Sequence, residues 1–152
     1  MKLFRFLFIT AVAVTLAVAA AVKMPKNFSL VCPDKGQAEI YCSSSALPSQ
    51  NAGNGIIVFC PARQLDQALT RCNGVQGISV TLAGSAEDFA TLLKYYRVEA
   101  SEVVNIGHLI VVSGVSGAIR GGIFVAGKRV NVQVAFDGQS VTVGSPVIFG
   151  DY

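Results

Sequence analysis

The sequence predicts an α+β fold in which two helices pack on one face of a mainly antiparallel sheet. Strand patterns alternate with two helical patterns in the first part of the chain and fill nearly all of its last third. The composition, 52% hydrophobic and 14% charged, is that of a folded protein and excludes a disordered one. A chain of 152 residues has room for one hydrophobic core, which excludes a multidomain enzyme.

The first residues predict export. Lys2 and Arg5 precede an apolar run over residues 6–22 that ends in small residues, as signal peptides do. This run is long for a signal core and short for a bilayer span, so residues 1–22 are either a cleaved signal peptide or an N-terminal membrane anchor. In both cases the basic residues stay cytoplasmic. We therefore expect the rest of the chain to be secreted or anchored on the extracytoplasmic side, touching the membrane only through residues 1–22.

The chain after the leader is predicted to be a tether followed by one domain. Residues 23–36 carry Lys, Pro and Gly without an apolar period, which is typical of a tether. We expect a single α+β domain over residues 37–152. It begins with a strand over residues 38–42, a polar loop over residues 43–55 and an apolar strand over residues 56–60.

Two helices are predicted next, with a strand between them. Pro61 suits the first position of a helix, and apolar residues at helical spacing extend the pattern to Cys72. Residues 77–82 alternate as a strand does. Ser85 is placed to cap a second helix, whose acidic first turn complements the helix dipole and whose apolar stripe ends at Tyr96.

The last third of the chain is predicted to form five strands. Its clearest local signal is Asp137-Gly138, which favours a two-residue type I′ turn and would place Val134 opposite Val141. This hairpin is apolar on one face. The five strands are expected over residues 98–106, 109–115, 122–126, 130–136 and 140–149.

The other face of this hairpin carries a polar strip. Asn131, Gln133 and Thr142 project from it because side chains alternate along a strand. Antiparallel sheets often wet one face, so the strip is either solvated or internally hydrogen-bonded, or it is a contact surface. We take Asn131, Gln133 and Thr142 as candidate binding residues.

Two motifs near the C-terminus carry a family resemblance. Residues 128–135 form an Asn-x-Gln strand, and residues 141–152 form a Gly-x-Pro strand that ends in Tyr. Together they resemble the close of the YwmB-type family of small exported bacterial proteins, whose fold is similar to that of the TATA-box-binding protein. The resemblance implies an α+β shape. It implies no activity, cofactor or DNA binding, because a fold alone does not define a function.

Four cysteines follow the leader and predict disulfides, since exported chains meet an oxidising environment. A continuous helix would hold Cys60 about 16 Å from Cys72, beyond the roughly 7 Å Cα limit for a bridge. Of the two remaining pairings we expect Cys42 with Cys60 and Cys32 with Cys72. Four free buried thiols remain the alternative.

Catalytic motifs are scarce in the sequence. His108 is the one histidine, and no C-x-x-C motif occurs, so neither a metal site nor a cofactor is expected. By strand alternation Glu99 and Glu102 do not share a face, so no carboxylate pair is predicted. A cysteine with His108 would be the one nucleophile and base pair that the composition allows.

These observations predict an exported, non-catalytic envelope protein that acts by binding. Without Lys2 and Arg5 the chain has ten basic and nine acidic residues, too little positive charge to bind nucleic acid. The expected partner is an envelope protein or polymer, and no residue pattern identifies the ligand. The alternative is a thiol-dependent hydrolase that uses a cysteine with His108.

Overall fold

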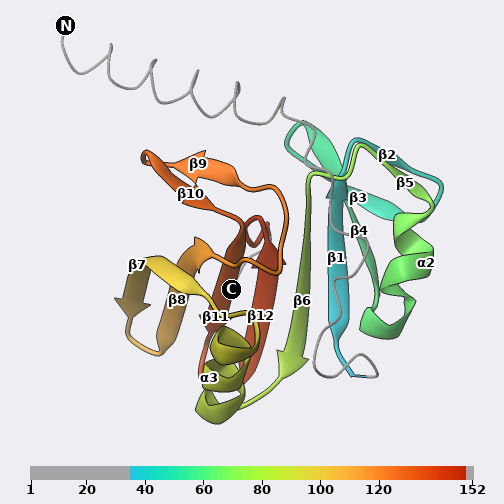
Figure 1. The fold of residues 1–152 in the computed structure, drawn as a ribbon. Coiled ribbons are helices and arrows are strands. Elements are labelled where there is room, and N and C mark those ends of the chain that lie inside the picture. The colour runs from blue at the N-terminus through green and yellow to red at the C-terminus, as the bar shows by residue number, and fades with distance from the viewer. Residues whose placement is uncertain (1–34, 150–152) are drawn as a thin grey trace, which may run out of the picture.

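A large antiparallel sheet organises the computed structural model, which describes residues 35–149. Each neighbouring pair of strands is antiparallel, and the order across the sheet is β3-β4-β1-β6-β12-β11-β8-β7 (Figure 1). The predicted α+β class is confirmed. The strands of this sheet are β1 (Gln37–Cys42), β3 (Ser49–Ala52), β4 (Gly55–Pro61), β6 (Gly77–Ala83), β7 (Glu99–Ile106), β8 (Leu109–Val115), β11 (Val132–Phe136) and β12 (Ser140–Ser145).

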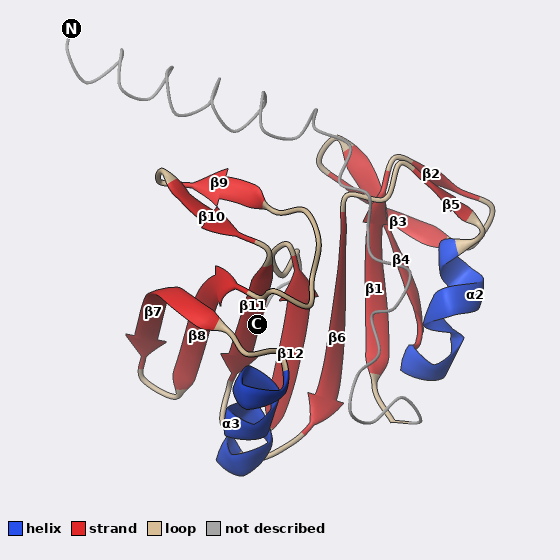
Figure 2. Cartoon of the chain, in the orientation of Figure 1, coloured by secondary structure: helices blue, strands red, loops and turns tan. Residues whose placement is uncertain are grey.

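Two small ribbons and two helices complete the described residues. One ribbon pairs β2 (Ser44–Ser45) with β5 (Cys72–Asn73), and the other pairs β9 (Ile123–Val125) with β10 (Lys128–Val130). The helices are α2 (Leu65–Leu69), preceded by a 3-10 turn, and α3 (Ala86–Tyr95) (Figure 2). Between residues 35 and 149 no helix is long and apolar enough to span a bilayer.

Both helices cover the same face of the sheet, as predicted. The registers place Ile40 beside Val58 and Ile78, and Val134 beside Val143, so that alternate residues of each strand meet on one face. The buried residues of α2 and α3 pack against these side chains. The core so formed consists of Ala38, Ile40, Cys42, Val58, Cys60, Leu65, Ala68, Ile78, Val80, Leu92, Tyr96, Ile119, Val132, Val134, Val141 and Val143.

The capping prediction for α3 is confirmed. The main-chain N–H of Asp88 donates to Ser85 Oγ over 3.3 Å, and the N–H of Ser85 donates to Asp88 Oδ2 over 2.7 Å. The hydrogen bonds that the Asp88 carboxyl accepts from the main-chain N–H and the hydroxyl of Ser85 lower its pKa. The reciprocal pair satisfies donors that the first helical turn leaves without partners.

The segment around α2 differs from the prediction at both ends. The helix expected to run to Cys72 ends at Leu69, because Cys72 pairs with Ser45 in the β2–β5 ribbon. The expected loop over residues 43–55 also contains β3, which returns along β4 through a turn where Gly53 has a positive φ of 57°. Pairing with the distant Ser45 ended α2 early, which a local pattern does not reveal. The β3–β4 hairpin is local, but its polar β3 does not have the apolar pattern of a strand.

The register of the β11–β12 hairpin is also corrected. Val134 lies opposite Val143, two positions from the predicted partner Val141, because Phe136 pairs with Val141 and the turn is longer than two residues. The Asp137 carboxylate builds this loop by accepting hydrogen bonds from the main-chain N–H groups of Gln139 and Ser140, over 2.8 and 2.7 Å. A shift by two keeps every side chain on its predicted face.

Several predictions lie outside the described residues. These are the leader over residues 1–22, most of the tether over residues 23–36 and Cys32. The last predicted strand, over residues 140–149, does lie within the described residues. It ends at Ser145 and not at residue 149, and the chain then turns onto the sheet.

Candidate functional site

Two of the candidate binding residues, Gln133 and Thr142, do lie on the face of the sheet opposite the helices. Thr142 shares a hydrogen bond of 2.9 Å between its Oγ1 and that of Thr81. Gln133 donates from Nε2 to Ser113 Oγ over 3.0 Å, and its Oε1 accepts from the main-chain N–H of Ile148 over 3.0 Å. Gln133 of the polar strip therefore binds the chain's own residues 146–149, which cross this face.

Asn131 is a buried structural residue. It lies between β10 and β11 with 1% of its surface exposed. Its Oδ1 accepts from the N–H of Ser116 over 2.7 Å, and its Nδ2 donates to the carbonyl oxygens of Ser116 and Ile119 over 2.9 and 2.6 Å. Both amide hydrogens and one acceptor position are used inside the fold, and the side chain is buried, which matches the internally hydrogen-bonded alternative.

The disulfide predicted between Cys42 and Cys60 is wrong. In the β1–β4 register Cys42 lies opposite Ile56, whereas Cys60 lies opposite Ala38. Four residues of strand separate the two positions, or about 13 Å at 3.3 Å per residue, which no bridge spans. Cys42, Cys60 and Cys72 are free thiols.

The three described thiols lie in one region beneath α2. Burial raises the pKa of Cys42 to about 11, and its hydrogen bond with the Cys72 thiol contributes in the same direction. Burial also raises the pKa of Cys60, with a smaller contribution from Cys72. Cys72 donates from Sγ to Ser45 Oγ over 3.5 Å. Raised pKa values disfavour the thiolate forms of Cys42 and Cys60, which makes these two thiols weak nucleophiles.

His108 lies far from these thiols. It follows Gly107 in the turn between β7 and β8, near the loop residue Gly138. Cys42 lies on β1, and β6, β12 and β11 separate β1 from β8. Four strand spacings of about 4.8 Å put these elements roughly 19 Å apart. The structure therefore does not bring His108 together with Cys42, Cys60 or Cys72.

The opposite edge of the sheet is unusually exposed. All but one of the residues of β7 are exposed, including Val103 at 61% and Ile106 at 68%. The β9–β10 ribbon adds Phe124 at 69%, and β10 lies against β7 and β8. We call Val103, Val104 and Ile106 of β7, together with Phe124 and Val125 of the β9–β10 ribbon, the exposed edge, and Figure 1 shows the strands that carry them. Large exposed apolar side chains on an edge strand are typical of interaction surfaces.

A bulge in β7 brings two negatively charged side chains to the same face of the strand. Ala100 lies opposite Gly114 and Glu102 opposite Ser113, so Ser101 is an extra residue. Glu99 and Glu102 therefore share one face, contrary to the prediction from alternation. Lys128 crosses from β10 and donates from Nζ to the carbonyl oxygen of Ser101 over 2.9 Å.

Strand periodicity did not identify the exposed edge. The signal available was Val103-Val104, two adjacent apolar residues that point to opposite faces, followed by Ile106. Such a pair is equally typical of a buried strand. The order of strands in the sheet shows that this strand is an exposed one and not a buried one. Among the described residues, β7 has one neighbouring strand.

Comparisons with models of known protein families, with curated proteins and with solved structures found no match to this chain. Within residues 35–149, no group of three or more His, Cys, Asp or Glu side chains is arranged to hold a metal ion.

Proposed function

We propose that this chain is an exported, non-catalytic envelope protein that acts by binding another polypeptide, which adds a strand to the sheet beside β7. The observation that carries this proposal is the exposed edge. Among residues 35–149, β7 is the last strand in the order and pairs only with β8. The YwmB-type resemblance and the extracytoplasmic location are part of the proposal.

The edge is suited to main-chain pairing over part of its length. Edge strands are commonly protected by bulges, charges, Lys or Pro. In β7 the bulge at Ser101 and the carboxylates of Glu99 and Glu102 protect only the first half. From Val103 to Ile106 the strand is regular and carries apolar side chains. A partner that adds a strand gains main-chain hydrogen bonds there. Val125 lies toward the other end of β7, beside Ser101 and Glu102.

The chemistry of the edge also describes the partner. Alternate apolar side chains of an extended segment would pack on Val104 and Ile106. A basic residue of the partner would complement Glu99 and Glu102. We therefore expect a polypeptide of the envelope, in preference to a polymer, as the partner.

Site-specific photo-crosslinking in intact cells tests this proposal. A crosslinking amino acid in place of Ile106 should give a defined adduct with an envelope protein, and Val104→Lys should weaken that adduct. The matched position is Tyr95, which is 54% exposed on α3 and lies outside the exposed edge. Equal products from positions 95 and 106, or an adduct with a second copy of this chain alone, would contradict the proposal.

A further inference from the structure

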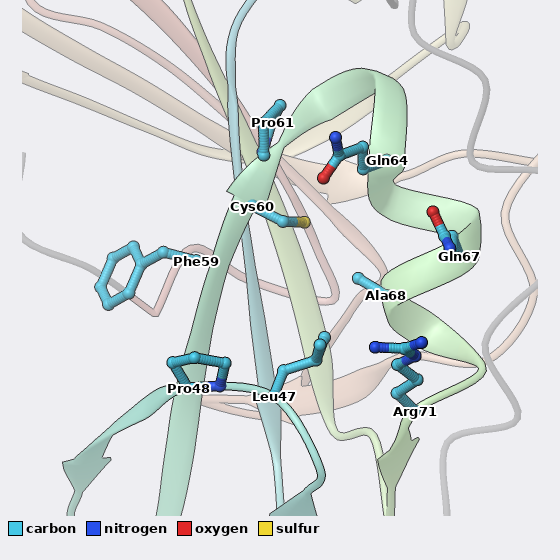
Figure 3. A pocket seen from close by; sticks show the side chains of 9 residues that line it. All are labelled: Leu47, Pro48, Phe59, Cys60, Pro61, Gln64, Gln67, Ala68 and Arg71. Carbon is cyan, nitrogen blue, oxygen red and sulfur yellow. The ribbon is translucent and has the colours of Figure 1, made fainter.

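A pocket lies toward the other side of the sheet, between the end of β4 and α2 (Figure 3). Its volume is about 290 Å³. We call it the α2 pocket. Its lining residues are Leu47, Pro48, Phe59, Cys60, Pro61, Gln64, Gln67, Ala68 and Arg71.

The floor of the α2 pocket is apolar. Leu47 comes from the segment between β2 and β3, and Ala68 faces the pocket from the buried side of α2. Figure 3 shows the Cys60 sulfur directed from β4 toward α2. Because Ala68 is small, the floor between helix and strand stays open to an apolar group.

The polar groups of the α2 pocket come from α2 and the residues beside it. Within the described residues, the side chains of Gln64, Gln67 and Arg71 make no hydrogen bond or ion pair. Figure 3 shows the Arg71 guanidinium directed toward Leu47 and Ala68. None of the nine lining residues is acidic, so the pocket carries one positive charge.

Hydrogen bonds fix the main chain at Arg71. Its N–H donates to the carbonyl oxygen of Ala68 over 2.9 Å, and its own carbonyl oxygen accepts from the N–H of Ala46 over 3.2 Å. Ser45 Oγ also donates to this carbonyl oxygen over 3.2 Å. The base of the Arg71 side chain is thereby fixed beside the apolar floor, while the exposed guanidinium remains accessible to an amphipathic anion.

We propose that the α2 pocket binds a small amphipathic carboxylate, with its apolar tail over Leu47 and Ala68 and its carboxylate on the Arg71 guanidinium. Arg suits this role because its planar donors match the two oxygens of a carboxylate. The amide of Gln64 offers a further donor at the far end of the pocket. This site is separate from the exposed edge and does not depend on the proposed polypeptide partner.

Titration of the exported chain with octanoate, monitored by the main-chain amide signals of Phe59, Ala68 and Arg71, tests the proposal. Octanoate should shift these signals saturably, and octanol, which has the same chain length without charge, should bind at least about five-fold more weakly. Arg71→Gln should weaken octanoate binding by about five-fold or more, since an exposed ion pair contributes on the order of 1 kcal/mol. Arg63→Gln, which removes an Arg outside the lining residues, is the matched control.

The outcomes separate clearly. Loss of octanoate binding in Arg71→Gln but not in Arg63→Gln supports the proposal. Equal binding of octanoate and octanol, or equal losses in the two variants, would overturn it, because binding would then not depend on the carboxylate at Arg71. Absence of saturable binding in the unmodified chain would also overturn it.

Discussion

The ring of Phe149 stacks on the ring of Tyr41, with the centroids 4.8 Å apart and the planes inclined by 16°. Gly77, opposite Tyr41 in the sheet, leaves the space for this contact, since a Cβ at position 77 would overlap the Phe149 ring. Gly144 similarly leaves room for the main chain at Ile148. The two glycines therefore let residues 146–149 lie directly on the sheet.

Gly77→Ala should lower the free energy of unfolding by about 1–3 kcal/mol, because the added methyl overpacks the contact with Phe149. Urea denaturation measures this loss. Phe149→Ala should remove most of the effect of Gly77→Ala when the two changes are combined. Strictly additive losses in this cycle would show that Gly77 and Phe149 do not make the contact described.

Asn131→Ala should destabilise the fold by about 3 kcal/mol or more. The change leaves one N–H and two carbonyl groups, of Ser116 and Ile119, without their buried partner, and each costs about 1–3 kcal/mol. Asn105→Ala, at an exposed position of β7, should change stability by no more than about 0.5 kcal/mol. Thermal unfolding compares the two variants, and equal midpoints would contradict the structural role of Asn131.

Asp137 should make stability depend on pH. Hydrogen bonds from Ser140 and Gln139 lower the pKa of this carboxyl from its ordinary value of 3.8 to about 2. A lowered folded-state pKa contributes stability above pH 4 that is lost as the pH falls toward 2. Because solvent screens the group, we expect about 1 kcal/mol.

Asp137→Asn keeps an acceptor for the loop but cannot titrate. Its stability should change less between pH 5 and pH 2 than that of the unmodified chain. Urea midpoints across this range measure the difference. Parallel pH curves for the two proteins would exclude Asp137 as the group responsible.

The thiols should differ in their rates of alkylation. Cys42 and Cys60 are 0% and 8% exposed, and their pKa values are raised, so both should react with iodoacetamide at pH 8 at least about tenfold more slowly than half-buried Cys72. Peptide mass spectrometry over time measures each rate. Recovery of a peptide pair linked through Cys42 and Cys60 would contradict the β1–β4 register.

Local patterns predicted much of this fold. Alternation located β6, an apolar run located β4, and the Ser85 cap marked the start of α3, because these features depend on neighbouring residues. The number of residues in the turn after Phe136 was predicted incorrectly. Its geometry depends on how the Asp137 carboxylate bonds the following main chain, which a two-residue turn signal does not reveal.

The candidate sites were harder to predict than the strands. Asn131 and Gln133 share a strand pattern, yet one is buried in a loop junction and the other fastens the C-terminal segment. The exposed edge and the α2 pocket both arise from the order of strands across the sheet. That order joins segments far apart in the chain, so no periodicity specifies it.

The position of β12 has a consequence for how the chain acquires its structure. This strand lies between β6 and β11, so the half containing β1 and the half containing β8 become one sheet only when residues 140–145 are in place. A polypeptide made N-terminus first leaves one edge of β6 unpaired until this final strand is available. A chaperone that shields that edge of β6 in the incomplete chain would prevent it from pairing with other polypeptides.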